Sequence, residues 1–207
     1  MAEQLFFDGI DAPAPPTDRL FFALLPDEYA ATQADRFRQR LAAERGLAGK
    51  QVRTEHLHVT LHHLGDHAGV PAGLVEQAGV VAGGLVASPF EAEFQAVMSF
   101  SRGARQQPLV LCGGHGLAAL VAFQRALGVA MIKGGLGRWV DRDFTPHMTL
   151  AYDPQTIERH DIRPISWVAS ELVMVHSLLG QTRHVIAGRW PLRGPAAGRA
   201  GEGGAGR

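Results

Sequence analysis

Two tetrapeptides of the same form, far apart in the sequence, constrain the fold of this 207-residue chain more than any other feature. They are His58-Val59-Thr60-Leu61 and His147-Met148-Thr149-Leu150. Each lies in a segment typical of a strand, in which residues i and i+2 share one face. Each motif therefore directs an imidazole and a hydroxyl to one side and two apolar side chains to the other. The chain must fold so that two strands each present such a pair while burying their opposite faces.

The remaining pattern predicts a mixed α+β fold rather than strict alternation of strands and helices. Pro26 and Asp27 separate a first strand from a first helix, because proline ends a strand and aspartate caps a helix. Gly46 marks the end of that helix, and Gly65-Asp66 is expected to end the strand of the first motif. We expect strands at 19–25, 56–64, 90–100, 109–112, 143–152, 166–176 and 184–190, and helices at 27–46, 72–86 and 117–133.

Length and end composition predict one catalytic body with an appendage at each end. The length favours a single domain of two lobes that share a core, here over residues 19–193. Residues 1–18 end in a proline-rich stretch and are expected to form an extended lead-in. Residues 194–207 lack an apolar period and are expected to be a disordered tail. No secretory signal and no bilayer-spanning apolar stretch is visible, so we expect a cytoplasmic protein.

The charge balance and the cysteine count limit the classes of partner and of site. Lys and Arg together number 20, as do Asp and Glu, so the formal charge is zero. Wrapping of a long nucleic acid depends on many unneutralised cations and is therefore excluded, whereas an RNA end or a small anion in a local cleft is not. The single cysteine, Cys112, excludes an internal disulfide framework and a cysteine-based zinc site.

Paired imidazoles and hydroxyls suit acid–base chemistry at phosphorus. Histidine changes charge near neutral pH, so one ring can accept a proton while the other donates one. In-line displacement at a phosphodiester needs such a pair on opposite sides of phosphorus, and hydroxyl donors stabilise the charge on its non-bridging oxygens. Such a site needs no metal ion. His58 and His147 are the candidate catalytic residues, and Thr60 and Thr149 the candidate phosphate-binding residues.

The motifs and their flanks resemble those of the two-histidine (2H) phosphoesterase superfamily, and specifically its bacterial and archaeal RNA 2′,3′-cyclic phosphodiesterases, also called 2′-5′ RNA ligases. The similarity extends over about residues 19–193. The segments that carry it are Arg19-Leu-Phe-Phe-Ala-Leu-Leu-Pro26, Glu55-His-Leu-His-Val-Thr-Leu-His-His-Leu-Gly65, Phe144-Thr-Pro-His-Met-Thr-Leu-Ala151, Ser177-Leu-Leu-Gly180 and Arg189-Trp-Pro-Leu192.

The resemblance implies a bilobal, pseudo-twofold α+β fold in which two antiparallel or mixed sheets flank a central cleft, with helices outside and one motif in each lobe. It implies an enzyme without a cofactor that opens a 2′,3′-cyclic phosphate, at an RNA 3′ end or in a small cyclic nucleotide, to a 2′-phosphomonoester, with reversible 2′-5′ RNA ligation as a related activity. By family analogy His58 protonates the departing 3′ oxygen and His147 activates the water. No membrane and no obligate protein partner is expected.

Two positions depart from the family pattern. Tyr152 stands where the second motif usually runs on to arginine, and His184 stands where an aromatic residue often follows the late glycine. We take both as candidate substrate-binding residues. Their identity leaves the substrate open between an RNA end, a cyclic nucleotide and another small cyclic phosphodiester.

Two other functions stay open. His56, His58 and His62 would share one face of a regular strand, which makes a metallohydrolase built on a histidine cluster one alternative; no acidic or cysteine ligand follows at a characteristic spacing. The other is an RNA-end or nucleotide-binding module without turnover, although binding alone does not require matched titrating groups.

The aromatic residues expected mainly in the core are Phe21, Phe22, Phe94 and Phe100.

Overall fold

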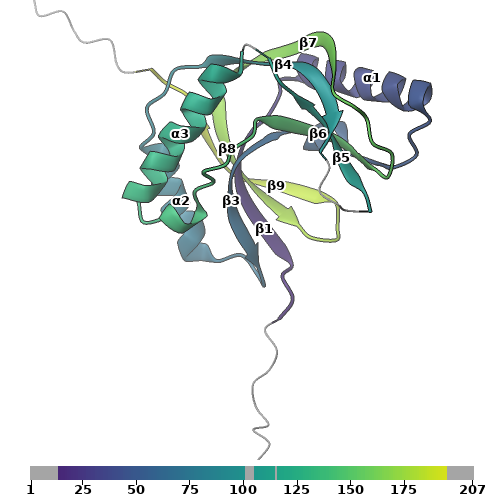
Figure 1. Cartoon of the computed structure of the whole chain (residues 1–207). Helices are drawn as coiled ribbons and strands as arrows, with labels where there is room; N and C mark the ends of the chain where they lie inside the picture. Colours follow the sequence, from purple (N-terminus) through teal and green to yellow (C-terminus); the bar gives the residue numbers. More distant parts are fainter. Residues whose placement is uncertain (1–13, 101–104, 115, 195–207) are drawn as a thin grey trace, which may run out of the picture.

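The described strands form two antiparallel sheets, and helices cover one face of each (Figure 1). This computed structural model describes residues 14–100, 105–114 and 116–194, and it has the predicted bilobal α+β architecture. In chain order its elements are β1 (Asp18–Leu24), α1 (Glu28–Arg45), β2 (Lys50–Gln51), the 3-10 turn η1 (Thr54–His56), β3 (Val59–His67), α2 (Ala72–Gly83), β4 (Phe90–Ser99), β5 (Gln107–Cys112), α3 (Leu117–Lys133), the 3-10 turn η2 (Gly137–Trp139), β6 (His147–Asp153), β7 (His160–Ala169), β8 (Glu171–Leu178) and β9 (Arg183–Pro191).

The strands divide so that each sheet carries one motif. The first sheet has the order β3-β1-β8-β9, and His58 immediately precedes its strand β3. The second has the order β2-β6-β5-β4-β7, and His147 begins its strand β6. Helices α2 and α3 pack together and contact strands β9, β3 and β4, whereas α1 contacts β6 and β7. Each sheet thus has one face under helices and one face toward the cleft.

Side-chain alternation along the strands identifies the two faces of each sheet. In β1, Leu20 and Phe22 enter the main core, whereas Phe21 joins a small cluster on the opposite face. In β5, Leu109 enters the main core, whereas Cys112 joins a second small cluster. Burial of each large apolar side chain stabilises the fold by roughly 1.5–3 kcal/mol. The main core therefore fixes which residues remain on the cleft face.

The first helix begins and ends as its sequence predicts. The carboxylate of Asp27 accepts a hydrogen bond from the backbone N–H of Ala30 at 2.7 Å, which satisfies one of the donors left free at a helix N-terminus. Gly46 follows the last residue with a left-handed φ of 68°, a conformation that glycine adopts without a steric penalty. These two residues fix the length of the helix that covers the second sheet.

The strand predicted at 166–176 is wrong, because the chain crosses there from one sheet to the other. Strand β7 ends at Ala169 in the second sheet and β8 begins at Glu171 in the first, separated by Ser170 alone. The apolar pattern continues across the crossing and contains no glycine or proline to mark it. A tertiary change of sheet therefore leaves no signal in local periodicity.

Several other boundaries differ from the prediction. The strand of the first motif begins at Val59 rather than at residue 56, which lies in the turn η1. Strand β3 does not end at Gly65-Asp66 but continues to His67, since a bulge opposite β1 accommodates the left-handed φ of 100° at Gly65. Strand β6 begins at His147 rather than at residue 143, and α2 ends at Gly83 rather than at residue 86. The short strand β2 had no recognisable sequence pattern.

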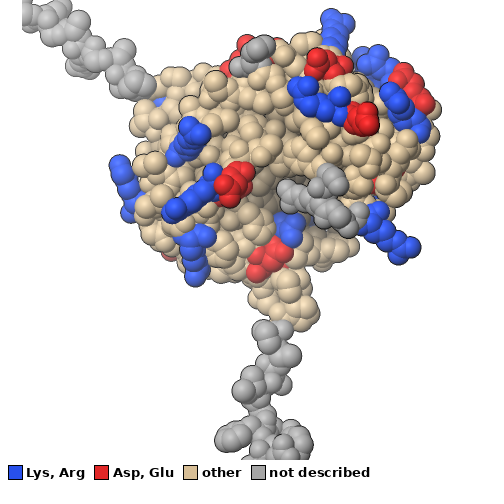
Figure 2. All heavy atoms as spheres, in the orientation of Figure 1, with Lys and Arg blue, Asp and Glu red and all other residues tan. Residues whose placement is uncertain are grey.

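The ends of the chain fall mainly outside the described residues. This applies to residues 1–13 of the expected lead-in and to 195–207 of the expected tail, so the boundaries of the 19–193 domain stay a prediction. Among the described helices, none combines the length and the apolar character needed to cross a bilayer. Over α1, acidic and basic side chains lie among one another (Figure 2), in keeping with the zero formal charge.

Candidate active site

The two motif histidines are held by the same backbone contact. Nδ1 of His58 lies 2.7 Å from the carbonyl oxygen of His56, and Nδ1 of His147 lies 2.7 Å from that of Thr145. A carbonyl oxygen only accepts, so Nδ1 carries the proton in both rings and donates it. In the neutral ring Nε2 is then the basic nitrogen, free to take a proton. Both histidines are thus oriented alike, one in each lobe.

A phenylalanine packs beside each of these rings. The ring centroids of Phe21 and His58 are 4.9 Å apart, and those of Phe100 and His147 are 5.1 Å apart. The prediction that the four phenylalanines lie mainly in the core holds for Phe22 and Phe94, which are fully buried in the main core. Phe21 and Phe100 instead belong to the small clusters on the cleft faces. Each of them packs against the neighbouring imidazole and limits the space around it.

One residue of each motif lines a common cavity of about 470 Å³, whereas His58 and Thr149 are not among its lining residues. Thr60 of the first sheet and His147 of the second line this cavity together. Its remaining lining residues come from β4, the adjoining Phe100 and the segment before β6: Met98, Phe100, Asp141, Asp143, Phe144 and Thr145. A ligand in this space contacts a hydroxyl of one motif and the imidazole of the other.

The electrostatic surroundings of His58 link it to the second lobe. Burial lowers the pKa of its half-buried ring below the ordinary histidine value, while the hydrogen bond to the carbonyl of His56 opposes that change. The nearby charges of His147 and His56 lower the pKa further. The charges of the two motif histidines are therefore coupled, and burial favours the neutral form of His58 in the free protein.

The two threonines lie on the cleft face beside their histidines. Thr60 pairs with Ala23 of β1, and Thr149 pairs with Val110 of β5; both partners belong to the small cleft-face clusters. Paired residues of neighbouring strands point to the same side of the sheet. Among the described residues, neither hydroxyl has a hydrogen-bond partner. Both are available to donate to a ligand.

His184, one of the two candidate substrate-binding residues, lies against the first motif. Its ring stacks on that of His56, with centroids 4.2 Å apart, and stands edge-on to His58 at 5.6 Å and to Phe21 at 5.9 Å. Burial lowers the pKa of His184 to about 4, and the charges of His58 and His56 contribute to the decrease. His184 is therefore a neutral, flat group at the edge of the site.

Tyr152, the other candidate, lies farther along the cleft. A bulge between Thr149 and Ala151 changes the alternation of β6, so Ala151 joins the core and Tyr152 returns to the cleft face opposite Pro108. Its side chain is 42% exposed. The position that follows the second motif thus faces the same cleft as His147, although it is not part of the 470 Å³ cavity.

Comparison with known proteins assigns the family. The model of the 2′-5′ RNA ligase superfamily matches residues 25–179, which span both motifs and well over half of the chain. The chain belongs to the 2′-5′ RNA ligase superfamily. It is therefore a two-histidine phosphoesterase by family, as the motifs indicated. No curated protein matches the chain.

Solved structures of low sequence identity share the fold of this superfamily member. The structure of Escherichia coli LigT without ligand is 24% identical, with a TM-score of 0.65 over 86% of this chain and 99% of LigT. The protein TT0787 of Thermus thermophilus is 21% identical, with a TM-score of 0.66 over 85% of this chain and 98% of TT0787. LigT also has structures in complex with phosphate and with 3′-AMP. At this identity the likeness supports the fold alone.

The histidines around the first motif do not share one face, contrary to the expectation for a regular strand. The register of β3 shifts opposite β1, so His62 pairs with Phe22 on the core side and is fully buried, whereas His63 pairs with Phe21 on the cleft side. In the part of the chain that the structure describes, no three His, Cys, Asp or Glu side chains are arranged to hold a metal ion. Among the residues that the structure places, the metallohydrolase alternative therefore has no ligand set.

Sequence reasoning missed the segment that leads into the second motif. Asp141, Asp143 and Phe144 line the cavity, and His62 fixes this segment by accepting a hydrogen bond at Nδ1 from the N–H of Asp141, 3.1 Å away. The Asp-Arg-Asp-Phe sequence itself carries no periodic signal. Only the position immediately before a motif histidine could have drawn attention to it.

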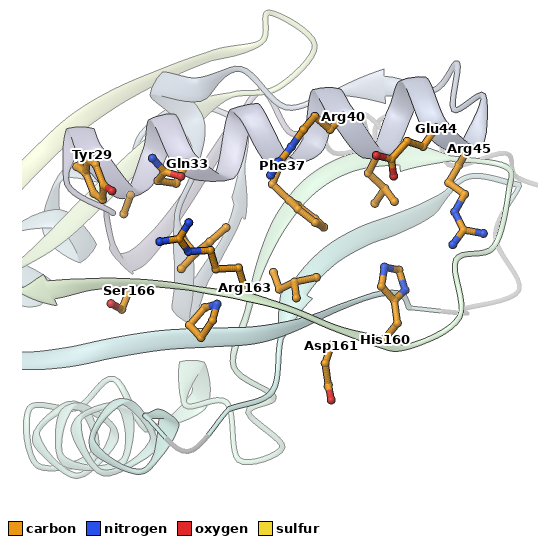
Figure 3. Close-up of a pocket in the computed structure, with 15 residues that line it drawn as sticks. Tyr29, Gln33, Phe37, Arg40, Glu44, Arg45, His160, Asp161, Arg163 and Ser166 are labelled. Carbon is orange, nitrogen blue, oxygen red and sulfur yellow. The ribbon is translucent and has the colours of Figure 1, made fainter.

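A second groove, of about 440 Å³, lies between α1 and β7 and contains neither motif. Figure 3 shows Arg45 of the helix and His160 of the strand on facing sides of this groove. Ile165, which also lines it, is buried in the main core, so the groove opens on the helix-covered side of the second sheet. It is separate from the cavity that Thr60 and His147 line.

Proposed function

We propose that the chain hydrolyses 2′,3′-cyclic phosphodiesters at RNA or nucleotide ends to 2′-phosphomonoesters, without a metal ion, by acid–base catalysis at His58 and His147. The observation that carries the proposal is the matched pair of imidazoles, each with Nδ1 bound to a backbone carbonyl and a threonine two residues later on the cleft face. The complexes of LigT with phosphate and with 3′-AMP support a nucleotide substrate for this superfamily member.

In the proposed reaction His147 takes a proton from water through Nε2, and the water oxygen bonds to phosphorus. The bond from phosphorus to the 3′ oxygen breaks, and His58 gives its proton to that oxygen, which leaves the phosphate on the 2′ oxygen. Solvent then restores the starting protonation of both rings. Each general acid or base of this kind contributes typically 10²–10⁴-fold to the rate.

The roles require His58 to be protonated when the substrate is bound, although burial holds its pKa low in the free protein. The phosphodiester anion raises the pKa of His58 when it binds, because an opposite charge nearby favours the protonated imidazole. Thr60 and Thr149 donate to the non-bridging oxygens, where negative charge increases in the transition state. Substrate binding itself thus prepares the acid.

The test compares native protein with His58→Asn and His147→Asn on adenosine 2′,3′-cyclic phosphate in the presence of a chelator. Native protein should form adenosine 2′-phosphate, and each variant should lose at least 100-fold in kcat. His160→Asn is a matched control, because Nδ1 of His160 lies 3.0 Å from the carbonyl oxygen of Glu158 but the ring lines the separate groove. Loss of turnover in chelator with rescue by zinc would contradict the metal-free mechanism.

Binding without turnover by native protein would favour the alternative of an RNA-end or nucleotide-binding module. Calorimetry distinguishes the enzyme from the binding module, because it measures binding of the product nucleotide whether or not turnover occurs. A 2′-5′ ligation activity would use the same geometry, with a 5′-hydroxyl in the place of the attacking water.

A further inference from the structure

Beyond the threonine pair, the cleft carries a group of cationic and phenolic side chains that the proposed reaction does not use. We call Arg19 of β1, Lys50 of β2 and Tyr152 of β6 the distal cluster. Lys50 and Tyr152 are directly paired across neighbouring antiparallel strands, and both are exposed. Since Tyr152 lies on the cleft face, its partner Lys50 points to the same side. Two strands of the second sheet thus contribute a cation and a phenol.

Arg19 faces the cleft from the first sheet. It is two residues before Phe21 on the same strand, and Phe21 contacts the ring of His58. The carboxylate of Asp66 accepts two hydrogen bonds from Arg19, from Nε and Nη2, each of 2.7 Å. Such a fork–fork pair fixes the plane of the guanidinium. The N–H groups of Nη1 remain free for a ligand, and the Arg19 side chain is 44% exposed.

The two halves of the distal cluster belong to two sheets that contact each other. Strands β3 and β6, which flank the cleft in their respective sheets, are in contact. The hydrogen bond to Asp66 is the main cause that raises the pKa of Arg19, and the charge of Asp66, together with that of Tyr152 on the other sheet when it is ionised, raises it further. Arg19 and Tyr152 thus face the same cleft from different lobes.

We propose that the distal cluster binds a second phosphate of the substrate, the 5′-phosphate of the nucleotide whose cyclic phosphate reacts at the two histidines. This rests on the proposed function and names its substrate class: a nucleotide phosphorylated on its 5′ side, as every nucleotide within an RNA chain is. A guanidinium with free N–H groups, an ammonium and a phenol together match the acceptor oxygens of a phosphate.

Spacing and charge favour this end of the cleft for the second phosphate. Tyr152 lies three residues after Thr149, about 7–10 Å along the strand, which is the scale of one nucleoside between its two phosphates. At the other end, Asp141 and Asp143 line the cavity beside His147 and would repel a further phosphate. Asp66 offsets part of the charge of Arg19, so Lys50 supplies the net positive charge.

The experiment is calorimetric binding of two product nucleotides to the full chain, adenosine 2′-phosphate and adenosine 2′,5′-bisphosphate. Native protein should bind the bisphosphate about 10- to 100-fold more tightly, as expected for charge-assisted hydrogen bonds. Arg19→Gln and Lys50→Gln should each reduce that ratio about tenfold. Arg36→Gln is the control, because Arg36 is exposed on α1 outside the cleft and should leave the ratio unchanged.

Lys50→Gln keeps the test decisive even if Arg19→Gln fails to fold, since Lys50 is exposed and its side chain has no hydrogen-bond or ion-pair partner among the described residues. Equal affinity of native protein for both nucleotides overturns the proposal, and so does a ratio that survives Lys50→Gln. Absence of cyclic phosphodiester hydrolysis would refute the proposed function but leave this binding ratio measurable, so the two failures are distinguishable.

Discussion

Two substitutions of the buried His62 should separate fold stability from the alignment of the second motif. His62 is fully buried on β3. Its Nδ1 accepts from the N–H of Asp141 at 3.1 Å, so Nε2 carries the proton and donates to the carbonyl of Gln124 on α3 at 3.0 Å. Asparagine preserves an acceptor near the Nδ1 position, whereas glutamine preserves a donor near the Nε2 position. Nδ1 also lies 3.4 Å from the side-chain amide nitrogen of Gln124. Each variant therefore keeps the contacts of one ring nitrogen.

The expected magnitudes follow from which group each variant leaves unpaired. Both variants lose one hydrogen bond of a buried group, so each should lower the free energy of unfolding by about 1–3 kcal/mol. Only His62→Gln frees the N–H of Asp141. That residue starts the segment that reaches Thr145, whose carbonyl holds His147. On the proposed function, kcat should fall about tenfold or more in His62→Gln and stay within about threefold in His62→Asn, because misplacement of a catalytic group costs rate.

Urea denaturation and steady-state hydrolysis of adenosine 2′,3′-cyclic phosphate would be measured on the same preparations. The expected pattern is similar stability in the two variants with unequal kcat and similar KM. Equal kcat in both variants, or a larger loss in His62→Asn, would refute the link from β3 through Asp141 to the second motif.

Three further predictions test the fold and the electrostatics. Asp27→Ala should lower the free energy of unfolding in urea by about 1 kcal/mol, and Asp27→Asn much less, because only the latter still accepts from Ala30; equal losses would contradict the cap. Gly65→Ala should lower the free energy of unfolding by about 1 kcal/mol or more, since φ is 100° and a Cβ would lie 2.6 Å from Trp139. Gly73→Ala, in open space on α2, should not lower it. Equal effects of the two substitutions would argue against this interpretation. By NMR, His184 should titrate near pH 4, so its contribution to stability is present above about pH 6.5 and lost as the pH falls toward 4; a midpoint near 6.5 would refute its burial.

Local sequence patterns were sufficient for most of the fold. Strand β1 was recognisable from a short apolar run ended by proline, and α1 from its capping aspartate and terminal glycine, because both depend on nearby residues alone. The helix at Leu117–Lys133 was predicted with the observed bounds. The change of sheet at Ser170 was not predictable, because it depends on which strand the chain pairs with and not on local periodicity.

Bulges explain why the site was only partly predictable. Alternation along β3 correctly assigns Thr60 to the cleft face and Val59 and Leu61 to the core. A register shift after Thr60 then moves His62 into the core as well. A second bulge in β6 returns Tyr152 to the cleft. Bulges are set by pairing with another strand, which a single sequence does not reveal. Arg19 lies on the cleft face by simple alternation on β1, but its pairing with Asp66 depends on the neighbouring strand and was not predictable.

The central claim is that two imidazoles from different lobes exchange protons across one phosphorus atom, and the pH dependence of kcat/KM tests it most directly. Native protein should show a bell-shaped profile. Its alkaline limb, in which kcat/KM falls as the acid His58 loses its proton, should begin below the ordinary histidine pKa of about 6.5, because burial lowers the pKa of His58 in the free protein. His58→Asn should lose the alkaline limb of the residual profile, and His147→Asn the acidic limb. Retention of both limbs in either variant would contradict the account.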